Sequence, residues 1–271
     1  MKTINTEELK QIQFDILMAF HTFCVEKDLE YSLAAGTLLG AVRHKGYIPW
    51  DDDIDICMTR PNYDKFIRSF NGSFPHYYVA APELDWNYYA PYANVCDDRT
   101  LLLEGKNGHN GQEIGVKIDI FPVDGCTGNL MDYLDLCNKS FNYCEIMRLK
   151  RRALFPSPRV TAFAKLLVQK IVYGFIPYAS LQKRIHNLCL KYPISTSPFV
   201  AQVAFDAIGF RVPKEMFDEY VDVEFEGKRF KAVKDYDTLL RVRYGDYMQL
   251  PPEEERVPHH GFTAFWKDGA D

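Results

Sequence analysis

Four carboxylates fall within five positions, at Asp51, Asp52, Asp53 and Asp55, in the segment Pro-Trp-Asp-Asp-Asp-Ile-Asp-Ile-Cys-Met of residues 49–58. Alternate side chains of an extended strand share a face, so Asp53 and Asp55 are expected to project together while the isoleucines face a core. Adjacent carboxylates repel each other, whereas a hard divalent cation takes oxygen ligands from carboxylates and substrate phosphates. The segment therefore predicts a site for Mg²⁺ (or Mn²⁺) held by Asp53 and Asp55, with Asp51 as a further metal carboxylate if the strand begins early enough. The alternative is a solvated acidic turn before a strand.

A glycine and a threonine, Gly36 and Thr37, stand fewer than twenty residues ahead of these acids and directly after the apolar run 31–35. A strand, a glycine that permits close backbone approach and a threonine at a helix start together offer N–H groups and a hydroxyl to phosphate. Gly46 is expected to end that helix. The chain must then return beside the first strand, which places the phosphate-binding turn and the acids on one side of a small sheet. A Gly-Thr pair alone is weak evidence, but this order is typical of nucleotidyltransferases.

A third acid, Asp119, lies in the alternating segment Val-Lys-Ile-Asp-Ile-Phe of residues 116–121. Alternation places Lys117 and Asp119 on one face of a strand and the isoleucines on the other. Asp119 is therefore a candidate third metal ligand, or the base that accepts a proton from an attacking hydroxyl. Arg43 or Lys117 would add positive charge for a bound phosphate. Two alternatives stay open, a surface pair of Lys117 with Asp119 and a salt bridge of Arg43 to the acidic cluster.

A longer pattern joins these residues. Residues 35–55 read Ala-Gly-Thr-Leu-Leu-Gly-Ala-Val-Arg-His-x-Gly-x-Ile-Pro-Trp-Asp-Asp-Asp-Ile-Asp and resemble the signature of the LicD family. Segments 117–125, 244–252 and 259–266 also resemble blocks of that family, so the likeness spans almost the whole chain. The last block contains His259 and His260, which are candidates for phosphate contact or proton donation, although histidines there are more often surface or packing residues.

The resemblance implies a phosphotransferase of the nucleotidyltransferase fold, more distantly related to fukutin-type ribitol-phosphate transferases. The implied reaction moves a phosphorylated alcohol, typically phosphocholine, from a CDP-alcohol donor to a hydroxyl of a cell-surface glycan. Phosphoethanolamine and polyol phosphates stay open as the transferred group. One rival hypothesis is a nucleotidyltransferase that attaches a nucleoside monophosphate to its acceptor, and another is a non-catalytic protein that binds glycan or lipid. An Asp-x-Asp sugar transferase is weaker because it leaves the Gly-Thr turn unexplained.

Periodicity predicts the α/β (α+β) class, with a small mixed sheet, flanking helices and a basic helical insert. The resemblance implies that this sheet is nucleotidyltransferase-like. Three parts are expected, a catalytic core over 1–128, the basic helical insert over 129–198, and a C-terminal hairpin and helix over 199–271 that complete the site. The expected helices are 6–28, 37–44, 61–70, several over 129–192, and one from Asp235 or Asp237 to about Tyr244. The expected strands are 31–35, 53–58, 77–81, 90–96 and 114–121, with a hairpin over 220–233.

Charge is unevenly distributed along the 271 residues, whose net charge of −5 argues against nucleic-acid binding. Residues 148–191 contain ten Lys or Arg and no Asp or Glu, while the remainder has 22 basic and 37 acidic residues. Basic amphipathic helices bind anionic membranes, so this segment is a candidate for peripheral contact where a lipid-linked glycan acceptor would be presented. The alternative is a helical subdomain that packs its apolar stripe on the core.

The cysteines and the hydropathy pattern bear on location. Seven cysteines without a Cys-x-x-Cys pair indicate buried reduced thiols rather than a disulfide framework or a zinc site. The first helix is amphipathic and unlike a signal peptide, and no apolar run reaches the eighteen residues that a membrane span needs. We therefore expect a cytoplasmic protein that can contact the inner face of the membrane.

Overall fold

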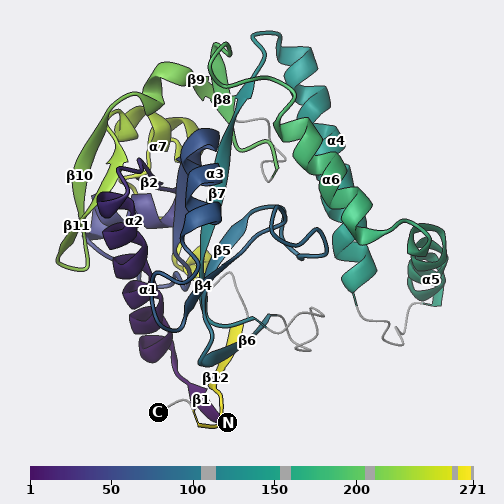
Figure 1. Ribbon diagram of the computed structural model, residues 1–271, viewed down its shortest axis with the longest axis horizontal. Coiled ribbons are helices and arrows are strands. Elements are labelled where there is room, and N and C mark those ends of the chain that lie inside the picture. The colour runs from purple at the N-terminus through teal and green to yellow at the C-terminus, as the bar shows by residue number, and fades with distance from the viewer. Residues whose placement is uncertain (105–113, 153–159, 205–210, 258–261, 270–271) are drawn as a thin grey trace.

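The computed structural model describes residues 1–104, 114–152, 160–204, 211–257 and 262–269 (Figure 1). Its central sheet has the strand order β2 (Ser32–Leu33), β3 (Asp55–Thr59), β7 (Lys117–Cys126), β5 (Ala93–Asp97) and β4 (Tyr77–Ala80). β3 and β7 are parallel, and the other neighbours along this path are antiparallel. The prediction of a mixed α/β protein is confirmed.

Three helices flank this sheet, α1 (Thr6–Glu26), α2 (Ala35–His44) and α3 (Arg60–Ser69). α1 begins with a capping box, in which Glu8 N–H donates to the Asn5 side chain and the Glu8 carboxylate accepts from Asn5 N–H. Its buried face contacts β5 and β7. The helix ends two residues before the expected position, and Asp28 follows in the left-handed region with a φ of +52°. A non-glycine residue in that conformation cannot continue a right-handed helix.

A second sheet brings distant parts of the chain together, with β12 (Phe262–Trp266) between β1 (Lys2–Ile4) and β6 (Thr100–Glu104). The predicted hairpin is confirmed as β10 (Tyr220–Phe225) and β11 (Lys228–Val233). Its turn residues Glu226 and Gly227 both have positive φ, as a type I′ two-residue hairpin turn requires. The helix α7 (Tyr236–Tyr244) follows, with the Asp235 side chain accepting from Thr238 N–H.

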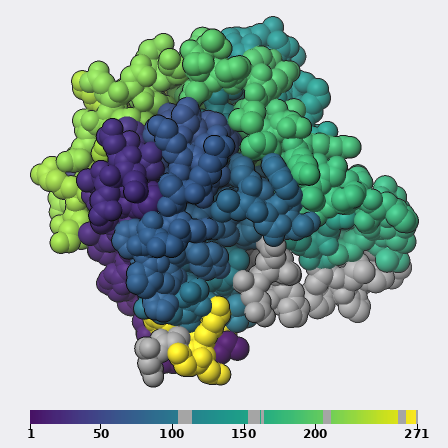
Figure 2. Space-filling model, viewed as in Figure 1, coloured from purple at the N-terminus to yellow at the C-terminus, as the bar shows by residue number. Residues whose placement is uncertain are grey.

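The predicted helices of the basic region are α4 (Leu130–Arg151), α5 (Val160–Gly174) and α6 (Tyr178–Cys189). α4 and α6 pack against each other around a hydrophobic cluster of their own. The strands β8 (Phe199–Ala201) and β9 (Arg211–Pro213) then return the chain to the end of β7. Figure 2 shows the three helices, in teal to green, along one side of the molecule. The division into three parts at 128 and 198 stays a prediction.

A buried ionic network joins the helical region to the core. Arg60, at the start of α3, donates from Nε and Nη2 to the two carboxylate oxygens of Asp124 at 2.6 and 3.0 Å. Its Nη1 donates to Glu83 Oε1 at 3.1 Å, and the same oxygen lies 3.2 Å from His186 Nδ1 on α6. Burial acts to raise the pKa of Glu83, but the His186 hydrogen bond and the Arg60 charge bring it below its ordinary 4.5.

All seven cysteines are free and buried, as expected for reduced thiols. Over the described part of the chain, no helix combines the length and the apolar character needed to cross a bilayer.

Candidate active site

The first three acids lie in a loop and not on a strand. β3 begins at Asp55, two residues later than the predicted strand 53–58, so that expectation was wrong at its start. The reason is a long-range contact, because Gln13 Nε2 on α1 donates to the Asp52 carbonyl at 3.0 Å. Asp51 N–H donates to the Ile48 carbonyl at 2.9 Å and closes a turn. These bonds hold the segment away from the sheet until the next residues pair with β7.

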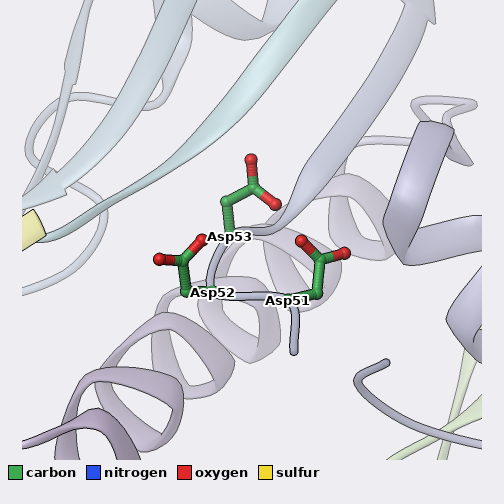
Figure 3. Close-up of side chains that lie close together, drawn as sticks. All are labelled: Asp51, Asp52 and Asp53. Carbon is green, nitrogen blue, oxygen red and sulfur yellow. The ribbon is translucent and has the colours of Figure 1, made fainter. Parts of the chain in front are cut away.

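Asp51, Asp52 and Asp53 form a compact carboxylate cluster (Figure 3). One carboxylate oxygen from each lies within 4.8 Å of the other two. Asp52 was not assigned to the site from the sequence, because strand alternation would have turned it away from its neighbours. In a loop, consecutive side chains can converge, and the run of three aspartates was the available signal. Clustered carboxylate oxygens are the donor set that a hard divalent cation prefers.

Asp55 and Asp119 lie side by side on the parallel strands β3 and β7, as directly paired register partners. Burial and the nearby charges of Asp53, Asp119 and Asp51 raise the pKa of Asp55 well above its ordinary 3.8. The four acids predicted to act together therefore lie within electrostatic reach of one another. A cation among them would relieve this repulsion, so the residues fit a divalent metal ion.

Asp119 is held by a buried polar network. Lys117 Nζ and Asn94 Nδ2 both donate to its Oδ1 at 2.5 Å, which leaves Oδ2 outside these two contacts. Asn94 is completely buried on β5, and its own side-chain oxygen accepts from the hydroxyl groups of Tyr88 and Tyr89. The predicted pair of Lys117 with Asp119 thus exists, but in the interior instead of on the surface. Asn94 was not foreseen, since only strand pairing brings it opposite Asp119.

The Gly36-Thr37 pair contacts the acids directly. Thr37 is 3% exposed, and its Oγ1 accepts from Asp55 N–H at 2.8 Å. A Cβ atom at Gly36 would lie 2.5 Å from Asp51 Oδ2, so only glycine leaves room for that carboxylate. The preceding Ala35 has a φ of +44°, a left-handed conformation that non-glycine residues seldom adopt and that is often found at functional sites.

A pocket of about 510 Å³ lies in front of the acids. Its acidic wall contains Asp51, Asp53 and Asp55, and α2 contributes Gly36 and Arg43. A second wall comes from the end of α7 and the segment after it, and it consists of Tyr244, Asp246, Tyr247, Gln249, Leu250 and Pro251. The lining also includes Ala35, Leu39, Ile48 and Trp50.

Arg43 binds the pocket wall formed by residues 244–251. Its Nη1 donates to the carbonyl oxygens of Tyr247 at 2.7 Å and of Gln249 at 3.2 Å. It therefore ties α2 to a segment that lies 204 residues away in the sequence. The residues of this wall were not assigned to the site in advance, although the family-like block 244–252 marked their segment. His259 and His260 lie outside the described residues.

Comparison with known proteins gives a consistent result. Residues 28–169 match the family model described as the LicD/FKTN/FKRP nucleotidyltransferase domain. The chain is 34% identical to the lipopolysaccharide cholinephosphotransferase LicD of Haemophilus influenzae, over 98% of this chain and 99% of that protein. An uncharacterised protein of Rickettsia prowazekii shares 35% identity over 20% of this chain and 24% of its own length. One of Rickettsia typhi shares 44% identity over 16% of this chain and 14% of its own. The chain belongs to the LicD family.

Proposed function

We propose that this protein transfers phosphocholine from a CDP-linked donor to a hydroxyl group of a lipopolysaccharide. One observation carries the proposal: three aspartates line a single pocket beside a fourth, in a chain similar over its whole length to a lipopolysaccharide cholinephosphotransferase. The transfer forms a bond between the acceptor oxygen and the phosphorus of phosphocholine. It breaks the bond from that phosphorus to the bridging oxygen, which leaves with CMP.

In this proposal, three of the acids bind the metal ion and the fourth accepts a proton. Asp51, Asp53 and Asp55 would hold Mg²⁺, which when bound neutralises the negative charge of the donor diphosphate and of the departing nucleotide. Gly36 keeps the space that the Asp51 carboxylate occupies. Thr37 fixes the backbone of Asp55 through the Asp55 N–H.

Asp119 acts as the base. Lys117 and Asn94 fix its Oδ1, so that Oδ2 accepts the proton of the acceptor hydroxyl as the new bond forms.

The pocket also supports choline as the transferred alcohol. Trp50, Tyr244 and Tyr247 line it together with Asp246. Each ring already has an Arg guanidinium 5.8 Å from its centroid, from Arg256, Arg243 and Arg241 respectively. The attraction for a quaternary ammonium ion therefore comes from the Asp246 carboxylate, from which an uncharged polyol would gain little. We propose that this wall receives the trimethylammonium group, and that the acidic wall receives the diphosphate with its metal ion.

The experiment is to incubate purified protein with CDP-choline, lipopolysaccharide and Mg²⁺, and to measure CMP release together with phosphocholine on the lipopolysaccharide. Asp55→Asn should abolish both products while the circular dichroism spectrum stays unchanged. Asp218→Asn, at an exposed position on another part of the chain, is the matched control and should retain activity. EDTA should stop the reaction, and Mg²⁺ or Mn²⁺ should restore it.

The rival hypotheses give different products. A nucleotidyltransferase would consume CTP and release pyrophosphate, and a non-catalytic binding protein would bind its ligand without turnover. CDP-ethanolamine and CDP-ribitol, tested in parallel with CDP-choline, identify the transferred alcohol. Equal turnover of all three donors would contradict the proposal that the part of the pocket lined by Trp50, Tyr244 and Tyr247 binds choline.

A further inference from the structure

Helix α5 presents its apolar side to the outside. Its partly buried positions, Leu166, Gln169, Lys170 and Tyr173, follow the three- and four-residue spacing of one helix face. The opposite face is apolar, and its large side chains are 40 to 84% exposed: Leu167, Val168, Ile171, Val172 and, just after the helix, Phe175. A surface helix normally has the reverse arrangement, with its apolar stripe on the core. Contiguous apolar surface of this kind marks a site of interaction.

Polar contacts hold α5 in this orientation. Lys170 Nζ, on the inner face, donates to the Lys150 carbonyl of α4 at 3.1 Å. Lys150 Nζ in turn donates to the carbonyl oxygens of Tyr173 and Ile176 at 2.9 Å and of Gly174 at 3.2 Å. Lys150 therefore binds carbonyl groups at and just beyond the C-terminal end of α5. These contacts hold the face that contains Lys170 and Tyr173 against α4. The outward orientation of the apolar face is therefore a property of the folded protein.

The surrounding charge indicates what covers this face. Residues 148–191 carry ten positive charges and no negative ones, whereas the remaining 22 basic and 37 acidic residues leave the rest of the chain at −15. The exposed members of the basic set, among the described residues, are Arg148, Arg152, Lys165, Lys183, Arg184 and Lys191. A second copy related by twofold symmetry would bring two such positive segments together, which repel. An anionic lipid surface complements both the charge and the apolar face.

The position of α5 suits contact with a surface. Figure 1 shows it at the end of the α4–α6 pair that is remote from the central sheet. With 15 residues it is too short to cross a bilayer, so it would lie in the plane of the interface.

We propose that α5 docks this protein on an anionic lipid bilayer, with its outward apolar face at the boundary of the acyl chains and the neighbouring Lys and Arg side chains at the phosphate groups. This goes beyond the proposed transfer reaction and does not depend on it. Docking would hold the protein at the membrane in which a lipopolysaccharide acceptor is itself held.

The test measures co-sedimentation of the full-length protein with vesicles, without donor or acceptor. Binding is expected to vesicles that contain phosphatidylglycerol, to fall with added salt, and to be weak with phosphatidylcholine alone. Val168→Asp should weaken binding by about tenfold or more. Val25→Asp is the matched control, since Val25 on α1 is 58% exposed and Val168 is 59% exposed, and it should bind like the parent protein.

A second measurement avoids a charged substitution. A cysteine placed at Val172 and labelled with a polarity-sensitive dye should shift to the blue with phosphatidylglycerol vesicles, whereas a label at Val25 should not. All seven natural cysteines are buried, so the new thiol reacts selectively. Absence of binding to anionic vesicles, or equal loss in both aspartate variants, overturns the proposal. A dimer in light scattering that Val168→Asp dissociates also overturns it, in favour of a second copy as the occupant.

Discussion

Replacing Thr37 by valine tests whether this residue positions Asp55. Thr37 is almost completely buried, and its Oγ1 accepts from Asp55 N–H at 2.8 Å. Valine has the same shape but lacks the oxygen, so the variant leaves a backbone donor without its partner beside the acidic cluster. The steric change is small, and the effect should come almost entirely from the lost hydrogen bond.

The size of the effect follows from this geometry. A buried donor left unsatisfied destabilises a protein by about 1–3 kcal/mol. For a chain of 271 residues, this corresponds to a fall in Tm of about 2–5 °C. Loss of the bond also frees the start of β3, and a displaced catalytic carboxylate should lower kcat by about 10- to 100-fold.

Thermal unfolding and initial rates of CMP release over a range of CDP-choline concentrations measure both effects. Thr37→Ser keeps the oxygen and should restore most of the stability and the rate. If the hydroxyl instead binds donor phosphate, Thr37→Val will raise KM at unchanged Tm. That result would refute the positioning role and return Thr37 to the phosphate-binding role expected from the sequence.

Three further predictions concern the surroundings of the site. Asn94→Ala removes the amide that donates to Asp119 and should lower kcat more than it raises KM, with a loss of about 2 kcal/mol in the free energy of unfolding, measured by urea titration. Gly36→Ala places a Cβ atom 2.5 Å from Asp51 Oδ2 and should raise the Mg²⁺ concentration needed for half-maximal rate by about tenfold. Since the pKa of Glu83 in the folded protein lies below its ordinary 4.5, ionised Glu83 stabilises the fold above that pH. Its contribution is lost on acidification through the lowered pKa, so the stability advantage of the parent over Glu83→Gln should be constant well above pH 4.5 and should shrink as the pH falls below 4.5.

Each of these predictions has a contrary outcome. Unchanged kcat in Asn94→Ala would remove that amide from the support of Asp119. Gly174→Ala, where the new Cβ meets no atom within 4 Å, is the control for Gly36→Ala; equal metal dependence in the two variants would contradict the steric reasoning. A constant difference between the parent and Glu83→Gln across the pH range would show that the ionisation of Glu83 does not contribute to stability.

Local sequence determined the helices, the hairpin and the identity of the acids. The capped periodicity of α1 and the alternation around Glu226-Gly227 are properties of neighbouring residues, so they predicted those elements nearly to their ends. The family signature indicated the LicD family before any coordinates, and the alternating segment that contains Asp119 placed this acid on a strand with one buried apolar face. These patterns arise from steric preferences within a few residues of one another.

Tertiary structure alone decided how the acids are arranged and what surrounds them. The bond from Gln13 to Asp52 spans 39 residues and turns an expected strand into a loop of converging carboxylates. The bonds of Arg43 span about 200 residues and add the aromatic wall to the pocket. The outward apolar face of α5 likewise depends on Lys150 of another helix. Such contacts are set by packing between distant segments, and no local periodicity encodes which side chain will reach which backbone carbonyl.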